Sequence, residues 1–246
     1  MDKQKFRIKW KIFTGKRPIS DKDLLYLFEQ KNFKLLKHIS LSPENEVLMV
    51  NFNSFELFEW FVKFFSLREP AQLALLDNEE FFKHYVGLHE LAHEVECELV
   101  RRNNEDLINY YIELRELNYD AEGIMLKVCS RNVIIPYIRM HTLYPHPLVQ
   151  LIKSGNEQYI KTYIDFHGLS WDTSQAALID LQNRELIKYF ICRYELFDNA
   201  QVRLVQTQDE ELLKMYVERH GLGNSAKLEI FKTSNVKLFE ICANKE

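Results

Sequence analysis

The stretch 208–222, QDEELLKMYVERHGL, decides the fold because close copies of it recur along the chain. Residues 103–117 read NNEDLINYYIELREL, and residues 155–169 read GNEQYIKTYIDFHGL. In all three, apolar residues occupy the fifth, sixth, ninth and tenth places. This spacing puts four side chains on one face of an α-helix, so the sequence predicts a repeated amphipathic helix.

Around this helix the copies define a repeat of about 26 residues. Its second place holds residues such as Asn104 and Asp209, which can cap the first helical turn. A leucine at the fifteenth place follows the helix end, and in His167-Gly168-Leu169 the glycine predicts a Schellman ending. Further apolar pairs predict a second, shorter helix, so each repeat is expected to be a helical hairpin. The predicted repeats start near residues 31, 53, 77, 103, 129, 155, 182, 208 and 234.

The expected fold class is all-α. We predict an α-solenoid over residues 20–246, a right-handed superhelix of stacked helical hairpins, preceded by a basic arm or cap at residues 1–19. In the first repeat, residues 32–39 should form the long helix. The pattern resembles the α-solenoid class that includes HEAT repeats and the bacterial leucine-rich-repeat variants. This resemblance implies a binding scaffold without indicating a ligand.

Composition narrows the class of protein. The chain has 246 residues, of which 46% are hydrophobic, so it can bury a large core. It contains no apolar run long enough for a membrane span, and its first residues lack the apolar core of a secretory signal, so we expect a cytoplasmic protein. The four cysteines are far apart, which argues against a zinc knuckle and against a dense disulfide framework.

Charge is unevenly distributed. Residues 1–20 hold seven basic residues and one acidic residue, a charge of +6, whereas the whole chain carries −4. Residues 21–246 therefore carry −10. Because phosphate neutralisation supplies most nucleic-acid affinity, the acidic charge of the array argues against broad nucleic-acid binding by it.

Residues 89–93 contain a His-Glu-x-x-His match. On one helix, His89 and His93 would share a face and bind zinc, with Glu90 as general base. The repeat alignment places His89 at the thirteenth place and Leu91 at the fifteenth, so the motif should straddle a helix end. A zinc metalloprotease is therefore a remote alternative. The thirteenth-place histidines are expected to cap helix carbonyls, with a pH-sensitive binding ridge as the other hypothesis.

The repeat 129–154 departs most from the pattern. It places Pro136 within the first helix, where a kink is expected, and residues 144–147, Tyr-Pro-His-Pro, in place of the turn between helices. The alternative interpretation is a ligand or partner contact. Its candidate residues are Arg139, His141, Tyr144 and His146.

The N-terminal segment alternates apolar and basic residues from Phe6 to Ile12, a pattern typical of a strand or extended arm. A helix with Phe6, Trp10 and Phe13 on one face is also possible. The segment could cap the first hairpin, or it could touch an anionic membrane or a nucleic acid. Under the second hypothesis its candidate partner-binding residues are Lys9, Trp10 and Lys11.

The tyrosines of the ninth place stand beside isoleucine or valine and recur at helical spacing. This pattern favours burial in the core over base stacking. Nucleophile elbows, phosphate-binding glycine loops and paired catalytic carboxylates are absent from the sequence. We therefore expect a protein that is no enzyme and needs no cofactor, a scaffold that binds a protein or peptide on a curved helical surface. Nucleic-acid binding through the basic arm is the alternative. The sequence does not indicate whether the protein is a monomer or an oligomer.

Overall fold

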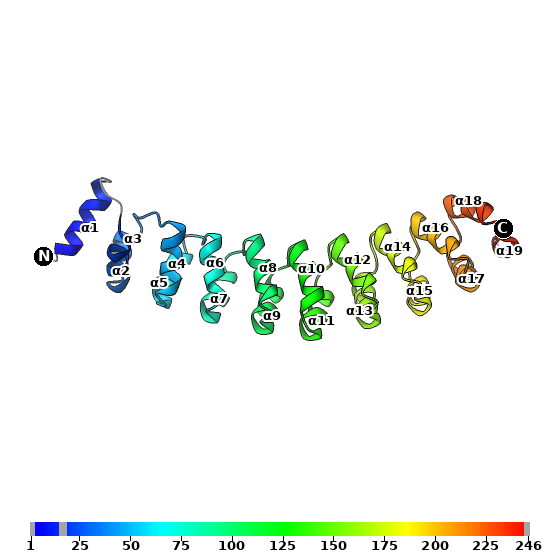
Figure 1. Cartoon of the computed structure of the whole chain (residues 1–246), viewed down its shortest axis with the longest axis horizontal. Helices are drawn as coiled ribbons and strands as arrows, with labels where there is room; N and C mark the ends of the chain where they lie inside the picture. Colours follow the sequence, from blue (N-terminus) through cyan, green and yellow to red (C-terminus); the bar gives the residue numbers. More distant parts are fainter. Residues whose placement is uncertain (1–2, 15–18, 244–246) are drawn as a thin grey trace. The chain divides into compact units, whose positions relative to one another are not determined.

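The computed structural model describes residues 3–14 and 19–243 (Figure 1). Within these residues the protein consists of helices joined by turns and short connections, with no strand. The helices are α1 (Lys3–Thr14), α2 (Asp21–Glu29), α3 (Phe33–Leu36), α4 (Pro43–Asn51), α5 (Phe55–Val62), α6 (Glu69–Leu75), α7 (Glu79–Val86), α8 (His93–Arg101), α9 (Glu105–Leu114), α10 (Tyr119–Val128), α11 (Arg131–Met140), α12 (Pro145–Lys153), α13 (Glu157–His167), α14 (Asp172–Asp180), α15 (Arg184–Ile191), α16 (Asp198–Gln206), α17 (Glu210–Arg219), α18 (Asn224–Thr233) and α19 (Val236–Ala243).

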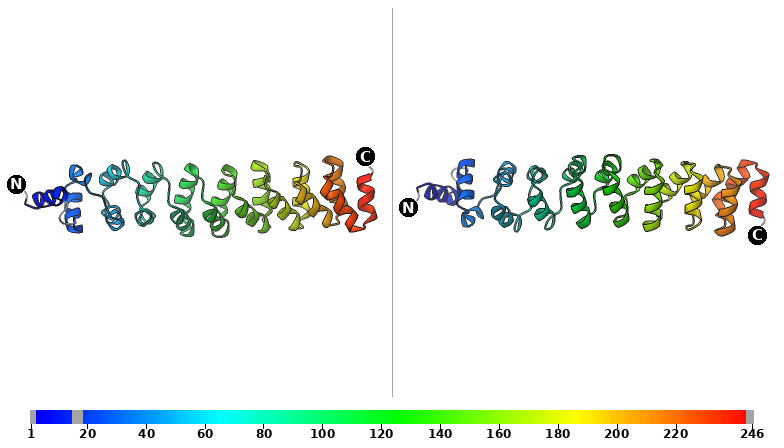
Figure 2. Two further views of the ribbon diagram at one scale, coloured as in Figure 1. Left: turned by 90° about the horizontal axis from the view of Figure 1, so that it is seen from above. Right: turned by 90° about the horizontal axis from the view of Figure 1, so that it is seen from below.

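The chain divides into an N-terminal half, Met1–Leu117, and a C-terminal half, Asn118–Glu246. From α4 onward the helices of each half form two rows, because a helix packs against the helix two further along the chain. The even row contains α4, α6 and α8 in the first half and α10, α12, α14, α16 and α18 in the second; the odd row contains α5, α7 and α9, and then α11, α13, α15, α17 and α19. Figure 2 shows the successive helices side by side within each half. The predicted all-α stack of helical hairpins is confirmed.

Most repeat starts share one backbone conformation. The first place has a positive φ, in the left-handed region, in seven of the nine predicted repeats: Lys31, Asn53, Asn103, Gly155, Gln182, Gln208 and Ser234. Glycine and asparagine adopt this conformation most easily. The second place then caps the odd-row helix, as at Asn104, whose side chain accepts from the Leu107 N–H. Asn78, Asn156, Asn183 and Asp209 cap in the same way, whereas Ser54 makes no side-chain cap.

Three local expectations are wrong. Even-row helices are not consistently shorter than odd-row helices, since α10 and α11 each have 10 residues. The helix expected over residues 32–39 covers only Phe33–Leu36, and the following residues form turns. Gly168 has φ 68° and ψ −162°, so it needs the freedom of glycine but lies outside the left-handed helical region of a Schellman ending.

The core lies between the two rows. Side chains at the fifth, sixth, ninth and tenth places of the repeats point into it, as expected from their spacing. In α15, for example, Leu186, Ile187, Phe190 and Ile191 are all buried. Each repeat thus buries its apolar face against its neighbours rather than within itself.

A buried polar side chain also recurs, at the fourth residue of the even-row helices. Glu122 in α10 shows its role, because one carboxylate oxygen accepts from the Tyr137 hydroxyl at 2.8 Å and the other from the Tyr144 N–H at 2.9 Å. Tyr137 belongs to α11, and Tyr144 is the residue before α12. One side chain therefore links three consecutive helices. We call this arrangement the polar bracket.

The bracket recurs in both halves. Gln72 accepts from the Ala92 N–H at 2.7 Å and lies 3.1 Å from the Tyr85 hydroxyl, and Gln201 accepts from the Gly223 N–H at 2.8 Å. The buried bracket residues are Glu46, Gln72, Glu96, Glu122, Gln175 and Gln201. The ninth-place tyrosines are thus core residues, as expected, but they also carry buried hydrogen bonds. Burial raises the pKa of Tyr216 to about 12, so its hydroxyl keeps its proton in the folded chain at neutral pH.

The repeat that contains α12 lacks the bracket. The equivalent place in α12 holds Leu148, which is fully buried. The tyrosine that follows, Tyr163, accepts from the Leu143 N–H at 3.2 Å, as Tyr85 in a bracketed repeat does from the Leu67 N–H. The chain therefore contains its own example of an apolar substitute at this place.

We predict that Glu122→Leu lowers the free energy of unfolding by about 3 kcal/mol, because it leaves the Tyr137 hydroxyl and the Tyr144 N–H buried without an acceptor. Adding Tyr137→Phe should recover about 1 kcal/mol, since one of the two stranded groups is removed. Urea unfolding followed by circular dichroism measures both values. Glu113→Leu, at an exposed position of α9, is the control and should change stability by less than about 0.5 kcal/mol. Equal effects of Glu122→Leu and Glu113→Leu would contradict the bracket.

Candidate functional site

The irregular repeat 129–154 keeps a regular helical hairpin. Helix α11 continues through Pro136 to Met140, so the proline does not end the helix. Pro145 is the first residue of α12, and Pro147 lies in the same first turn. The expectation that residues 144–147 replace the turn between the helices is therefore wrong. Proline is well tolerated in a first helical turn because the N–H groups there have no partner within the helix.

The four candidate residues of this repeat have separate surroundings. Arg139 is exposed on α11 with its guanidinium 5.8 Å from the centre of the Phe166 ring. His141 packs against the Tyr137 ring at 4.8 Å. His146, near the start of α12, has its Nε2 atom 2.7 Å from the Gln150 side-chain amide.

Tyr144 has a different setting from these three. Its ring meets Tyr119 edge to face at 6.4 Å, at the edge of the even row. The structure thus distributes the four candidates over a helix end, a turn and the start of the next helix, and only Tyr144 joins a larger feature, described below.

The thirteenth-place side chains tie neighbouring odd-row helices together. His89 Nε2 lies 2.6 Å from the carbonyl oxygen of Val62, and His220 Nε2 lies 2.8 Å from that of Ile191. Each belongs to the last turn of the odd-row helix in the preceding repeat. His167 makes the same contact, and the Tyr194 hydroxyl does so where histidine is replaced. The expected capping of carbonyls is found, but the capped helix is the preceding one.

The His-Glu-x-x-His match does not lie on one helix. Helix α7 ends at Val86, and α8 begins at His93, so His89 lies in the connection between them. Glu90 is exposed and pairs with Arg115 at 3.7 Å. The predicted straddling of a helix end is confirmed, and the geometry that a zinc metalloprotease helix requires is not formed. Within the described residues, no group of three or more histidine, cysteine or acidic side chains is arranged to hold a metal ion.

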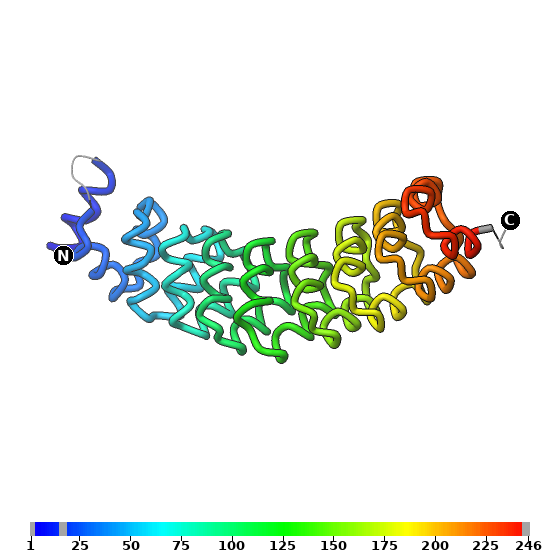
Figure 3. The backbone as a smooth tube through the Cα atoms, turned by 45° about the vertical axis from the view of Figure 1, so that its right-hand side comes forward, coloured from blue at the N-terminus to red at the C-terminus, as the bar shows by residue number. Residues whose placement is uncertain are grey.

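A row of exposed aromatic side chains lies along the C-terminal half, where the even-row helices begin. The row, which we call the aromatic edge, consists of Tyr119, Tyr144, Trp171 and Phe197, each 46–52% exposed. Tyr119 is the first residue of α10, and the other three immediately precede α12, α14 and α16. These helices pack side by side, as the tube in Figure 3 also shows, so the four aromatics follow one another at the starts of neighbouring helices.

Polar brackets hold the backbone of this edge at two of its four residues, Tyr144 and Phe197. The N–H of Tyr144 donates to Glu122, and the N–H of Phe197 donates to Gln175 at 2.7 Å. Because the main chain is fixed from inside, the aromatic side chains are presented outward. A buried bracket side chain thus bonds the backbone of an exposed aromatic residue.

Acidic side chains accompany the aromatic edge. Trp171 and Phe197 flank a cavity of about 660 Å³, and Asp172, Glu195 and Asp198 contribute to its lining. Asp120 follows Tyr119 in the same manner. The cavity therefore combines two large aromatic rings with carboxylates, a chemistry suited to cationic side chains. Sequence reasoning found Tyr144 but missed Tyr119, Trp171 and Phe197, although an aromatic residue before an aspartate recurs at Tyr119, Trp171 and Phe197.

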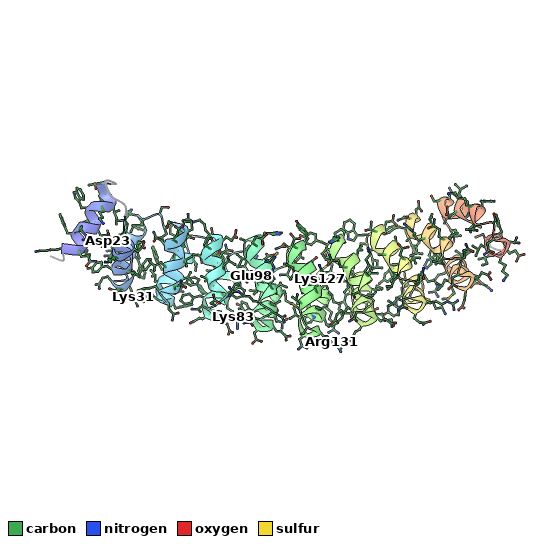
Figure 4. The ribbon with its side chains drawn as sticks, viewed as in Figure 1. Asp23, Lys31, Lys83, Glu98, Lys127 and Arg131 are labelled. Atoms are coloured by element: carbon green, nitrogen blue, oxygen red, sulfur yellow. The ribbon has the colours of Figure 1, made fainter. Side chains whose placement is uncertain are left out.

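The N-terminal segment is a helix, not a strand or extended arm. Helix α1 docks on α2 through Ile8, which is buried, and through two ion pairs to Asp23. Arg7 lies 2.7 Å and Lys11 2.6 Å from the Asp23 carboxylate, and the Asp23 side chain is fully buried. Asp23, labelled in Figure 4, thus lies between the two helices. These contacts are what a cap on the first hairpin requires.

The candidate binding residues of this segment divide between its two sides. Lys11 faces α2 and is paired with Asp23, whereas Lys9 and Trp10 are exposed. Burial of Asp23 disfavours its charged form, but hydrogen bonds from Lys11, Ser20 and Arg7 outweigh that effect. They hold the pKa of the Asp23 carboxyl well below its usual range.

Comparison with known proteins gives no match: no protein-family model, no curated protein and no solved structure is significantly similar to the chain. Within residues 3–14 and 19–243, no helix has both the length and the apolar character needed to cross a membrane.

We predict that Asp23→Asn lowers the free energy of unfolding by about 2 kcal/mol at neutral pH, because it removes the charge that holds Arg7 and Lys11. Asp23 has a lower pKa in the folded chain than in the unfolded chain, so its stabilisation is present above the unfolded pKa of about 3.9 and is lost as pH falls below it. Urea unfolding between neutral and acidic pH should show the two proteins converging. Asp21→Asn, at an exposed position on the same helix, is the control. A difference that stays constant down to low pH would exclude this role of Asp23.

Proposed function

We propose that the protein is a non-catalytic interaction scaffold, and that the aromatic edge binds an extended, positively charged peptide segment of a partner protein. The observation that carries the proposal is the series of half-exposed aromatic rings on four adjacent helices, with carboxylates beside them. Aromatic residues dominate binding energy at protein interfaces, and exposed rings attract lysine and arginine side chains. The carboxylates favour the same partners.

The spacing of the edge supports an extended partner. Packed helices lie about 8–10 Å apart, so equivalent aromatics of adjacent repeats are separated by roughly that distance. A polyproline II segment advances about 3.1 Å per residue, so about three residues span one repeat. Every third residue of such a segment would therefore meet the next ring, and the intervening residues could reach the carboxylates.

The predicted binding can be tested without knowing the natural partner. A random-peptide display library selected on the immobilised full chain should yield peptides rich in lysine and arginine. Trp171→Ala combined with Phe197→Ala should weaken the selected peptides by at least about tenfold in fluorescence anisotropy, since it removes both rings that flank the cavity. Added salt should weaken them too.

The matched control is Phe166→Ala combined with Leu228→Ala, which removes two exposed apolar side chains that lie off the edge. This variant should bind the peptides as tightly as the wild type. Selected peptides without basic residues, or peptides that bind both double variants equally, would contradict the proposal.

A further inference from the structure

Helix α1 has an apolar face that its docking does not use. The docked side carries Ile8 and Lys11, whereas Phe6, Trp10 and Phe13 are 55%, 48% and 67% exposed. These three residues are spaced i, i+4 and i+7, so they form one stripe along the helix. At about 100° per residue, this stripe lies opposite Ile8. A helix that is fixed on one side thus presents a row of aromatic rings on the other.

Basic side chains flank the stripe. Lys3, Lys5 and Lys9 are exposed, and the Lys9 ammonium lies 5.9 Å from the centre of the Phe13 ring. Asp23 lies on the docked side of α1, where it pairs with Arg7 and Lys11. The outward side therefore combines aromatic and cationic groups.

The same chemistry continues on the neighbouring helices of the N-terminal half. Phe13 packs against His38 at 6.2 Å. Close by in sequence, a shallow hollow of about 420 Å³ is lined by Phe33, Lys34, Lys37, Trp60, Phe64 and Phe65. Phe64 and Phe65 are 63% and 44% exposed. Aromatic rings beside lysines are thus found on two surfaces of this half.

We propose that the outward face of α1 docks onto a lipid membrane surface that carries anionic headgroups. Amphipathic helices that lie in the membrane interface have this composition: tryptophan and phenylalanine enter the boundary between headgroups and acyl chains, and flanking lysines meet the anionic lipids. The ion pairs with Asp23 hold α1 in place, so the protein presents the stripe already folded. This interaction goes beyond peptide binding at the aromatic edge and does not depend on it.

A membrane fits this face better than a nucleic acid does. The three rings form one stripe on a helix and can enter an apolar layer together, whereas bases stack on separate ring faces along a basic groove. The basic residues beside the stripe are lysines, and the arginine of this helix, Arg7, is paired with Asp23. Lysine serves as a point charge toward lipid headgroups, whereas arginine is preferred for nucleic-acid recognition.

The test measures binding of the full chain to vesicles by sedimentation. The protein should bind vesicles of phosphatidylcholine mixed with phosphatidylserine, should bind pure phosphatidylcholine vesicles far more weakly, and should lose binding as salt rises. In a Trp60→Phe, Trp171→Phe background, Trp10 is the sole tryptophan. Its emission should shift to shorter wavelength on adding the mixed vesicles, because the ring leaves water.

Two variants separate the two parts of the face. Phe6→Ala, Trp10→Ala and Phe13→Ala together should abolish binding to the mixed vesicles. Replacing Lys3, Lys5 and Lys9 by glutamine should weaken it on the order of a hundredfold, since each lysine near an anionic surface contributes about fivefold. Phe166→Ala, Leu228→Ala and Phe231→Ala, three exposed positions in the C-terminal half, form the control and should bind as the wild type does.

The side chains replaced in the α1 and control variants are exposed, so these variants should keep the thermal unfolding midpoint of their parent protein, and a midpoint measurement checks this. The proposal is overturned if the folded wild type does not bind mixed vesicles, or if the aromatic variant binds them as well as the control. Binding of a labelled single-stranded oligonucleotide without any binding to vesicles would assign the face to nucleic acid instead. The peptide selection on the aromatic edge is unaffected by any of these outcomes.

Discussion

Most hairpins of this protein stack on the next with a buried carboxylate or amide that satisfies backbone and tyrosine groups that stacking would otherwise strand. Glu122 illustrates the constraint, since it bonds the Tyr137 hydroxyl and the Tyr144 N–H. An even-row helix begins with unpaired N–H groups, and burying one of them without an acceptor is costly. Apolar contacts alone would hold the rows together, but they would not fix where one helix starts relative to its neighbour. The directional bonds of the bracket fix that start. They also position the main chain of Tyr144 and Phe197 in the aromatic edge.

The repeat, its caps and its apolar face could be predicted from the sequence because they depend on neighbours within one helix. The role of Gln72 could not, because its partners, Tyr85 and Ala92, lie in the next repeat and become neighbours only after stacking. A buried glutamine or glutamate in an otherwise ordinary helix looks like a surface residue in the sequence. The recurrence of such residues beside a buried alanine, as in Ala121-Glu122 and Ala200-Gln201, was the available signal.

Two other outcomes have the same cause. The segment around Trp10 alternates like a strand, yet it is a helix, because Asp23 in the next helix accepts from Arg7 and Lys11 one turn apart. His89 was correctly placed beyond a helix end, but its carbonyl partner belongs to another repeat. The residues of the proposed aromatic edge show the same contrast between signals within one repeat and signals that need several repeats. Tyr144 was identified because its repeat is irregular, whereas Trp171 and Phe197 lie in regular repeats and became visible only as members of a row.

Leu148 interrupts the polar brackets within the C-terminal half, and this has a mechanical consequence. Hydrogen bonds depend on the alignment of donor and acceptor and weaken steeply at large misalignment, whereas apolar contacts are non-directional and change little when two surfaces slide. The junction from α12 to α14 is therefore the compliant joint of this half: a pull or twist along the stack is absorbed there first, while bracketed neighbours on either side move as rigid blocks. Amide hydrogens near Trp171 should accordingly exchange with solvent sooner than those near Phe197, whose N–H is held by Gln175.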